Sequence, residues 1–402
     1  MEIYFRHIHR RGKMKRVLIL GSGVYQVPLI KKAKNMGLYT IVTSIRGKYP
    51  GFLYADKCYY ENTTDKEVIL QIAQKENVDA ILTSGTDVAV STIGYVCRRL
   101  GLNGVSEKSA TLVTNKALMK EAFRNYQVCT PEYAIAHSAE DAKMAALKLG
   151  YPVMFKCVNS SGSRGVIKVK DSCEIDRAYE YASSVTEKKY IVIEKFVDGC
   201  EIGLDGFIIN EDKMFFVPHD KIVYSNGMTN VPIGHVFPYT CDDTLHQKLL
   251  EQAEKAIRAL NLKNCFFNMD ILISSDKVYI IEVGARTGAT CIPELISLHY
   301  NIDYYQMMLD VALGHSVSIP TKPFQASAGC ILYSEKDGVV RKIDYSSDEG
   351  GIIAFDIQVG EYVSKFQTGN HRIGHMLATG DTAELALEKL ETMKRHIVLQ
   401  IF

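Results

Sequence analysis

The first hundred residues alternate short apolar segments with longer amphipathic ones, and this order constrains the fold more than any other feature of the sequence. The apolar runs cover residues 16–20 (RVLIL), 39–44 (YTIVTS) and 80–85 (AILTSG). Helical patterns lie between and after them, one opened by the capping residues Thr64 and Asp65 and one closed by Gly101. A β-α-β-α order requires a parallel sheet covered by helices, so we predict an α/β fold whose N-terminal, doubly wound domain ends near residue 105.

A turn at residues 21–23 (GSG) joins the first predicted strand to its helix and raises the question of a dinucleotide site. Gln26 replaces the third glycine of the GxGxxG pattern, and the second strand ends in Thr43 and Ser44, without an acidic residue for a ribose. A nicotinamide-dependent oxidoreductase is therefore disfavoured. The turn still exposes helix N-terminal amides that suit a carboxylate or phosphate, although a tight turn without a ligand fits equally well.

The composition is that of an ordinary globular protein, with 402 residues, 47% of them hydrophobic and 23% charged. A net charge of +1 argues against nucleic acid or a membrane surface as a partner, and no apolar run approaches the roughly 18 residues needed to span a bilayer. The ten cysteines show no CxxC pair or Cys/His metal spacing, which indicates reduced thiols in a cytoplasmic protein. Residues 1–13 are basic and lack the apolar region of a secretory signal, so we treat them as a disordered extension.

Beyond residue 139 the pattern changes to a series of short strands with links rich in Gly, Ser and Asp, which favour antiparallel sheet. Helices are predicted over residues 139–149 and 245–262, and a strand hairpin over residues 265–284 with its turn near 274–277. The segment from about residue 316 predicts a smaller α/β region that ends in an amphipathic helix capped near Asp381 and Thr382.

Residues 156–165 (KCVNSSGSRG) place one lysine at the end of an apolar strand, before a run of small residues. A hairpin turn would explain the small residues. The lone cation Lys156 also fits a lid over phosphates, because glycine and serine let the backbone approach a ligand closely. The two interpretations are compatible, since a hairpin loop can also cover a ligand.

Asp270 and Glu282 stand within the otherwise apolar strands of the predicted hairpin, where an unpaired carboxylate is costly to bury. Across a hairpin the two could face each other, and close carboxylates repel unless a cation lies between them. Magnesium takes carboxylate oxygens together with phosphate oxygens. The pair therefore indicates a metal and a phosphate ligand.

Four motifs in order, NKALMKEAF, YPVMFKCVNSSGSRGV, EKFVDGCE and NMDILI…YIIEVGARTGA, resemble those of the ATP-grasp superfamily of carboxylate–amine ligases. The superfamily includes D-alanine–D-alanine ligase, biotin carboxylase, carbamoyl phosphate synthetase and the L-amino-acid ligases. The resemblance runs from Met14 to the C-terminus. It implies an N-terminal Rossmann-like domain over 14–105, an ATP-grasp domain of two α+β lobes over 106–315, and a C-terminal α/β subdomain over 316–402.

The resemblance also implies ATP and Mg²⁺ as cofactors, with Mn²⁺ as the alternative ion. The implied nucleotide contacts are two phosphate-binding lysines, the lid, the hinge between the lobes and a ribose carboxylate: Lys116, Lys156, Ser161, Gly162, Ser163, Gly165, Glu194, Lys195, Val197 and Glu201. Glu194 and the backbone of Val197 would hold adenine. Asp270 and Glu282 would bind the metal, and the implied catalytic cations at the transferring phosphoryl group are Arg286 and Lys221.

The sequence departs from the family pattern at Gly284, where many relatives have Asn two residues after the second metal carboxylate. One coordination position is therefore either lost or supplied elsewhere, with Asn268 or a water as candidates. His371 and Arg372 belong to no motif with readable chemistry, so a structural role is favoured for them over a substrate contact.

The activity implied by the resemblance is an ADP-forming ligase that activates a small carboxylate as an acyl phosphate and couples it to an amine. Its partners would be ATP, the carboxylate and the amine, with amino acids as the expected substrates and a homodimer as one possible state. Two alternatives stay open: an ATP-dependent carboxylase that uses bicarbonate, and an inactive nucleotide-binding regulatory protein. The presence of both lysines and both carboxylates counts against inactivity.

Overall fold

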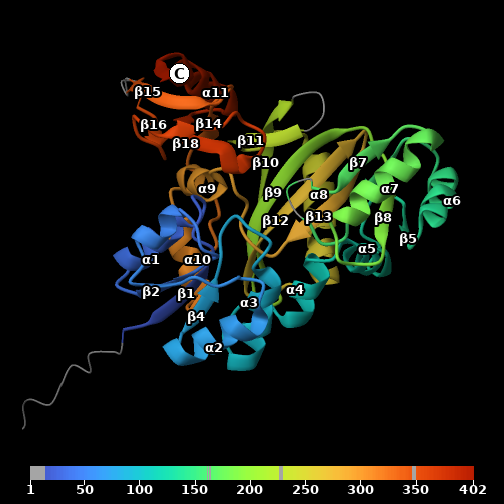
Figure 1. Cartoon of the computed structure of the whole chain (residues 1–402), viewed down its shortest axis with the longest axis horizontal. Helices are drawn as coiled ribbons and strands as arrows, with labels where there is room; N and C mark the ends of the chain where they lie inside the picture. Colours follow the sequence, from blue (N-terminus) through green and yellow to red (C-terminus); the bar gives the residue numbers. More distant parts are fainter. Residues whose placement is uncertain (1–13, 161, 163, 226–229, 346–349) are drawn as a thin grey trace, which may run out of the picture.

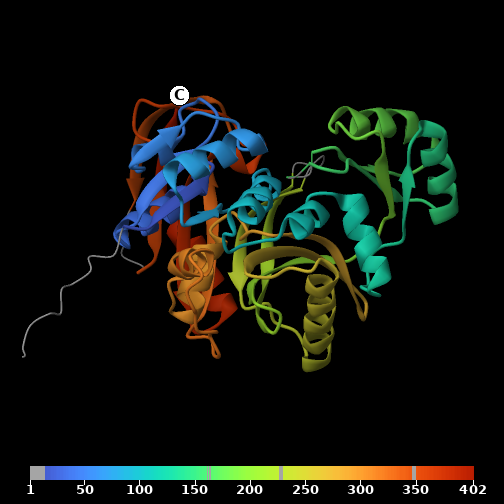
Figure 2. The same cartoon turned by 90° about the horizontal axis from the view of Figure 1, so that it is seen from below.

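The computed structural model describes residues 14–160, 162, 164–225, 230–345 and 350–402, so the predicted extension at 1–13 lies outside the described part. Figure 1 shows three masses: the N-terminal domain, a lobe formed by residues of the middle of the chain, and the C-terminal part, joined by long central strands. Figure 2, turned by 90°, shows the middle lobe set apart from the other two. In the described ranges, no helix is long and apolar enough to cross a membrane.

The N-terminal domain confirms the predicted parallel sheet, with strand order β3-β2-β1-β4. Its elements are β1 (Arg16–Leu20), α1 (Val27–Asn35), β2 (Tyr39–Thr43), η1 (Pro50–Leu53), β3 (Lys57–Tyr59), α2 (Lys66–Glu76), β4 (Ala80–Leu82) and α3 (Val90–Leu100). Alternate residues of β1 enter two different cores: Leu18 packs with α2 and α3, and Val17 with α1. Both faces of the sheet are therefore covered, as a doubly wound domain requires.

Two helices, α4 (Glu107–Val113) and α5 (Lys116–Asn125), lead into the small lobe. This lobe is an antiparallel sheet of order β5-β8-β6-β7. Its elements are β5 (Tyr133–Ala136), α6 (Ala139–Leu149), β6 (Val153–Lys156), β7 (Val166–Val169), η2 (Ser172–Glu174), α7 (Ile175–Ser184) and β8 (Ile191–Lys195). Helices α6 and α7 share one apolar core with the sheet, which leaves its other face toward the rest of the molecule.

The large lobe is built on an eight-stranded sheet of order β13-β12-β9-β10-β11-β14-β18-β16. Its first part consists of β9 (Cys200–Ile209), β10 (Lys213–Ser225), β11 (Asn230–Phe237), α8 (Asp243–Ala259), β12 (Cys265–Ser274) and β13 (Lys277–Gly284), followed by α9 (Ile292–Tyr300) and α10 (Tyr304–Ala312). The antiparallel pairing and the predicted 265–284 hairpin are confirmed. Helix α10 shares an apolar core with α1 and so ties this lobe to the N-terminal domain.

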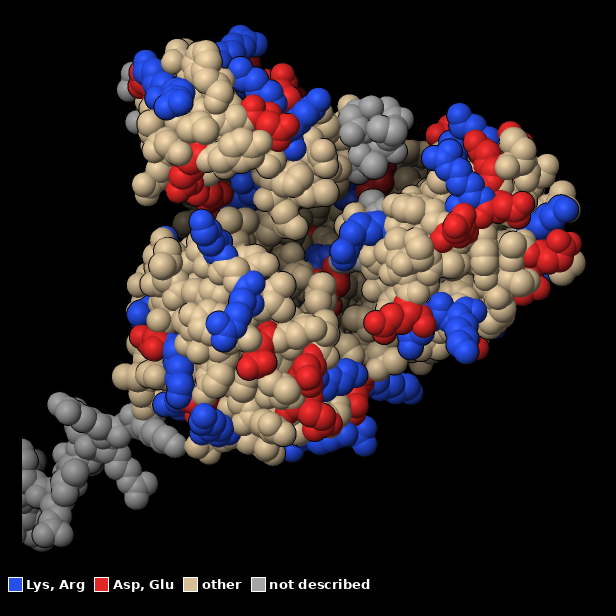
Figure 3. All heavy atoms as spheres, in the orientation of Figure 1, with Lys and Arg blue, Asp and Glu red and all other residues tan. Residues whose placement is uncertain are grey.

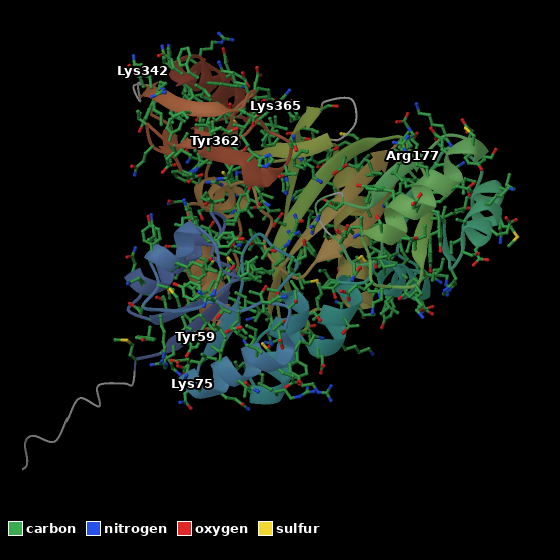
Figure 4. The ribbon with its side chains drawn as sticks, in the orientation of Figure 1. Tyr59, Lys75, Arg177, Lys342, Tyr362 and Lys365 are labelled. Atoms are coloured by element: carbon green, nitrogen blue, oxygen red, sulfur yellow. The ribbon has the colours of Figure 1, made fainter. Side chains whose placement is uncertain are left out.

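The C-terminal part continues the same large sheet, because β14 pairs with β11 and then with β18. Its elements are β14 (Ala326–Tyr333), β15 (Gly338–Tyr345), β16 (Ile352–Phe355), β17 (Tyr362–Val363), η3 (Gly369–His371), β18 (Arg372–Gly380), α11 (Ala383–Arg395) and β19 (Ile397–Ile401). Strands β17, β15 and β19 form a separate three-stranded sheet, whose surface carries Lys342 and Tyr362 (Figure 4). Thr382 caps α11 as predicted.

All ten cysteines are free thiols, as their spacing predicted. Five of them are buried, and four of these five, Cys97, Cys265, Cys291 and Cys330, fill apolar space in the cores.

Candidate active site

The predicted site residues gather where the small lobe faces the large lobe. Figure 3 shows the molecule hollowed between the small lobe and the remainder, with basic and acidic side chains at the mouth of the hollow. The small-lobe side of this groove carries Lys156 and Glu194 at strand ends. The large-lobe side carries Glu201, Lys221, Asp270 and Glu282 on β9, β10, β12 and β13.

Asp270 and Glu282 are direct partners across the β12–β13 hairpin, so the predicted juxtaposition of the two carboxylates is confirmed. Each carboxylate forms an ion pair with a lysine. Lys116 Nζ lies 2.8 Å from Glu282 Oε1, and Lys221 Nζ lies 2.6 Å from Asp270 Oδ1. The described residues contain no cluster of three or more His, Cys, Asp or Glu side chains that could hold a metal by themselves. A metal at this pair would therefore need further ligands, as phosphate oxygens would provide.

Lys221 is almost completely buried, with 4% of its side chain exposed, and it also lies 2.6 Å from Glu201 Oε1. Burial disfavours its charge, but Asp270 and Glu201 outweigh burial and raise the pKa of Lys221. The lysine is therefore a fixed cation between the predicted metal and ribose carboxylates. Its predicted role toward the phosphates of a nucleotide stays a prediction.

Lys116 is the first residue of α5, because Asn115 caps that helix by accepting from the backbone N–H groups of Ala117 and Leu118. Its Nζ also donates to the carbonyl of Ser160, 2.9 Å away in the predicted lid. Burial opposes the charge of Lys116, and Glu282 more than offsets burial and raises its pKa. This lysine thus joins the helix, the lid and the metal strand.

Arg286 lies beside a carboxylate that sequence reasoning missed. Asp87, in the loop after β4, accepts from Arg286 Nε at 2.8 Å and from Nη2 at 2.6 Å. A Cβ at Gly284 would stand 2.7 Å from Asp87 Oδ1, closer than real Cβ atoms approach. The glycine that replaces the family Asn therefore makes room for this ion pair.

Asn268, one candidate for the missing coordination position, already makes hydrogen bonds through both atoms of its amide. It stands opposite Gly284 in the hairpin, but its Oδ1 accepts from Arg286 Nη1 at 3.1 Å and its Nδ2 donates to Asp205 Oδ2 at 2.6 Å. Asp205, which is fully buried, also accepts from the backbone N–H of Gly288 at 2.7 Å. The amide of Asn268 thus serves to link Arg286 to the buried Asp205.

Lys156 and Glu194 meet at the ends of β6 and β8, with Nζ 2.8 Å from Oε2. A second lysine that we did not predict, Lys120, lies 3.5 Å from the same oxygen and donates to Thr130 Oγ1 at 2.5 Å. Burial lowers the pKa of Lys120 to about 8, against the opposing effect of Glu194. Glu194 Oε1 is buried and has no hydrogen-bond partner among the described residues, so it can accept from a ligand.

The predicted lid connects β6 and β7 as an antiparallel hairpin, which confirms that geometry. Gly162 and Gly165 have φ of +66° and +69°, values that glycine adopts without strain. The predicted lid residues Ser161 and Ser163 lie outside the described residues. In the hinge, Lys195 ends β8 and its Nζ donates to the carbonyl of Gly150 at 2.7 Å, and Val197 follows in the connection to β9.

The missed residues carry signals that the sequence contains. Asp87 comes shortly after a parallel strand, at the edge of the sheet where ligand-facing side chains gather. Lys120 is one helical turn after Lys116, and Asp205 is an acid within an apolar strand, as Asp270 is. What the sequence does not reveal is their partners, which come from distant segments.

Comparison with known proteins shows the class of enzyme to which this arrangement belongs. Residues 113–290 match the ATP-grasp domain family, and residues 331–401 match the L-amino acid ligase C-terminal domain 2 family. The chain belongs to the ATP-grasp superfamily of ADP-forming carboxylate–amine ligases, as its motifs predicted.

Similar proteins extend over nearly the whole chain. A formate-dependent phosphoribosylglycinamide formyltransferase of Hydrogenovibrio crunogenus is 26% identical over 390 residues, covering 93% of this chain and 94% of that protein. An alanine–anticapsin ligase of Bacillus subtilis is 26% identical over 346 residues, covering 77% and 72%. The crystal structure of a phosphoribosylglycinamide synthetase from Anaerococcus prevotii is 28% identical, with a TM-score of 0.82 and coverage of 97% and 100%. The predicted fold is thus confirmed.

Proposed function

We propose that this protein uses Mg-ATP to activate a small carboxylate as an acyl phosphate and then couples the acyl group to an amine. The observation that carries the proposal is the arrangement around one groove of two facing carboxylates, Asp270 and Glu282, with fixed cations on either side. Such an arrangement supports phosphoryl transfer, in which the protein mainly positions groups and neutralises charge. The division of the chain at residues 105 and 315 belongs to the same proposal.

In this proposal Lys116 and Lys156 contact the phosphates, and the 157–165 hairpin closes over them. The buried, unpartnered Oε1 of Glu194 supports a role as acceptor for the adenine amino group, with the Lys195–Val197 backbone beside it. Glu201, whose side chain is 52% exposed, is free to accept from ribose hydroxyls.

Asp270 and Glu282 fit a magnesium ion, because they are hard oxygen donors that face each other across the hairpin. When bound, such an ion would neutralise charge on the phosphate oxygens. The chain's own residues carry the rest of the chemistry. In the proposal, Arg286, which Asp87 orients, and Lys221 stabilise the phosphoryl group in transfer.

The proposed reaction has two steps. An oxygen of the substrate carboxylate attacks the γ-phosphorus, and the bond to the bridging β–γ oxygen breaks, so that ADP leaves with that electron pair. The amine nitrogen then attacks the acyl carbon, and the C–O bond to phosphate breaks as the amine releases a proton to solvent. Closure of the hairpin would protect the acyl phosphate from water.

The proposal is tested by measuring ADP and phosphate release from Mg-ATP with single amino acids, amino-acid pairs, formate and bicarbonate. We expect release that needs both a carboxylate and an amine. Release with bicarbonate alone would instead indicate a carboxylase, and tight ATP binding without release would indicate a regulatory protein. Formate and alanine belong in the panel because the names of the similar proteins mention them.

The control pair is Glu282→Gln and Glu211→Gln. Glu211 is an exposed carboxylate paired with Lys263 in the turn after β9, far along the sheet from the hairpin pair. We expect Glu282→Gln to lose about 10²-fold or more in turnover while staying folded, and Glu211→Gln to stay active. Near-normal turnover of Glu282→Gln would refute the assignment of Glu282 as a metal ligand.

A further inference from the structure

Lys120 is a buried lysine that the proposed reaction does not use. It lies one helical turn after Lys116 on α5, and only 1% of its side chain is exposed. Its Nζ donates to Thr130 Oγ1 at 2.5 Å, and that hydroxyl in turn donates to the carbonyl of Ile280 at 2.7 Å. The ammonium group is therefore fixed in the interior and offers almost no surface to a ligand.

Lys120 shares one carboxylate with a second lysine. Its Nζ lies 3.5 Å from Glu194 Oε2, the same oxygen that Lys156 Nζ approaches to 2.8 Å. Only 2% of the Glu194 side chain is exposed, so two largely buried ammonium groups face one buried carboxylate. One positive charge would already balance Glu194, and the other is left for an anionic ligand to balance.

The two lysines differ in what they can do when an anion binds. Lys156 ends β6 directly before the 157–165 hairpin, and 11% of its side chain is exposed. A phosphate at Lys156 would compete with Glu194 for the three N–H donors of that ammonium group. Lys120 is enclosed and held by Thr130, so it stays beside Glu194 whether or not a phosphate is bound.

We propose that Lys120 is the permanent counter-ion of Glu194 and keeps this carboxylate charged and oriented when Lys156 turns to the phosphates. Oε1 of Glu194, buried and without a partner among the described residues, then remains a charged acceptor for the base. A carboxylate accepts from the amino group of adenine and repels the carbonyl oxygen that inosine carries in its place. Lys120 is thus a positioning residue that sets which purine is accepted without contacting the nucleotide. The inference rests on the proposed function and adds the choice of base to it.

The electrostatics of the three side chains agree with this role. Burial alone would raise the pKa of Glu194, but Lys120, followed by Lys156, outweighs burial and lowers that pKa. Without Lys120, and with Lys156 on a phosphate, Glu194 would be a buried carboxylate lacking a cation and would take up a proton from solvent. The protonated group could donate to the inosine carbonyl, so discrimination between the two bases would weaken.

The test measures the Kd of Mg-ATP and of magnesium inosine triphosphate (Mg-ITP) by calorimetry, without a carboxylate substrate. We expect the wild-type protein to bind Mg-ATP at least ~10²-fold more tightly, since a site built to bond an N–H group rejects a ligand that lacks it. In Lys120→Met the ratio of the two Kd values should fall below about tenfold, through weaker binding of ATP and tighter binding of ITP.

A pair of substitutions at Lys120 separates charge from packing. Methionine follows the shape of the lysine stem without its charge, whereas arginine keeps the charge and changes the shape. Lys120→Arg should therefore keep a ratio closer to wild type than Lys120→Met does, and the reverse order would overturn the inference. Lys120→Met should fold, because Lys156 still neutralises Glu194 in the nucleotide-free protein, and Lys120→Gln serves as a second neutral variant. Lys255→Met, which removes an exposed lysine paired with Glu251 on α8, should keep the wild-type ratio.

A wild-type ratio in both neutral variants would also overturn the inference, as would equal affinity of the wild-type protein for the two nucleotides. Both results would leave the proposed ligase standing, because they concern the base and not the transfer of the phosphoryl group. Failure of the wild-type protein to bind Mg-ATP would instead refute the proposed function, and the inference with it. The Tm of each variant without nucleotide establishes that the variant is folded.

Discussion

Substitution of Gly284 tests directly how the Asp87–Arg286 ion pair is held, because a side chain at this position would collide with Asp87. A Cβ at this position would stand 2.7 Å from Asp87 Oδ1, the atom that accepts from Arg286 Nε at 2.8 Å. Both partners are largely buried, with 16% of the Arg286 side chain and 27% of the Asp87 side chain exposed. Gly284→Ala should therefore displace the Asp87 carboxylate and weaken its pair with Arg286.

The expected loss of unfolding free energy follows from the two hydrogen bonds between Arg286 and Asp87. Hydrogen bonds to charged groups are each worth about 1.5–3 kcal/mol, and Asp87 makes two to Arg286. Asp87→Ala removes both, and we expect it to lower stability by about 2–4 kcal/mol. Gly284→Ala strains one of them and should lower stability by about 1–2 kcal/mol, with a tenfold or larger loss of kcat/KM through the misplaced guanidinium.

The assay is a double-mutant cycle on Tm and on kcat/KM for ADP release. Once Asp87 is gone, the extra methyl group meets no carboxylate, so Gly284→Ala should do little further harm in the double variant. Full additivity of the two changes would refute the reasoning, as would a Gly284→Ala protein with wild-type stability and activity. Restoration of the family Asn by Gly284→Asn should be more harmful than alanine, because the larger side chain begins with the same Cβ.

Three further predictions concern stability. Glu76→Gln should lower the unfolding free energy by about 1–3 kcal/mol at pH 7. The pKa of Glu76 is lowered to about 2, because its bonds to Lys57, Tyr59 and Arg16 outweigh burial. The stability difference between wild type and variant is therefore fully present above the usual glutamate pKa and should shrink as pH falls toward 2, as measured by denaturant titrations. Burial lowers the pKa of Lys120 to about 8, below its unfolded value of 10.5. The wild-type protein should therefore gain unfolding free energy relative to Lys120→Met as pH rises from about 8 to about 10. A difference in unfolding free energy that does not change over this pH range would contradict the lowered pKa. In thermal unfolding, Gly165→Ala should lower Tm more than Gly162→Ala. Both glycines have positive φ, but only a Cβ added at Gly165 would clash with a neighbour, Cys157 Sγ at 2.7 Å.

Local sequence patterns were enough to predict the elements and one central contact of the site. The β-α alternation predicted the parallel sheet, and the hairpin at 265–284 predicted that Asp270 faces Glu282, because both features depend on neighbouring residues. The roles of Lys116 and Lys156 came from motifs and still await experiment. Their position at the groove between the lobes agrees with those motifs.

The contacts that the sequence did not reveal join distant segments. Arg286 and Asp87 are separated by 199 positions, and no periodicity links a loop of the N-terminal domain to a strand end of the large lobe. The same holds for the C-terminal part, whose strands extend the central sheet through the pairing of β14 with β11. The local pattern predicted an α/β region there, but pairing between distant strands depends on tertiary packing that short-range patterns do not encode.

The lysine–carboxylate pairs of the groove also have a consequence for how ligands bind. In the ligand-free protein Glu282 holds Lys116, and Asp270 and Glu201 hold Lys221, so both predicted metal carboxylates are already neutralised. A divalent ion alone would have to displace both ammonium groups, which would leave buried Lys116 with only the Ser160 carbonyl and buried Lys221 with only Glu201, and this loss of counter-charge is unfavourable. Phosphates would give those ammonium groups new partners, so magnesium and ATP should bind with strong mutual cooperativity.

We therefore expect Mg²⁺ alone to leave the Tm of the wild-type protein nearly unchanged at a concentration that, with ATP present, raises it clearly. Lys221→Met provides the contrast, because it leaves Asp270 and Glu201 without their shared cation. In that variant Mg²⁺ alone should raise Tm, while the additional rise on adding ATP should shrink. A wild-type protein stabilised as much by Mg²⁺ alone as by Mg-ATP would show that the lysines do not compete with the metal, and the carboxylate pair would then be an independent cation site.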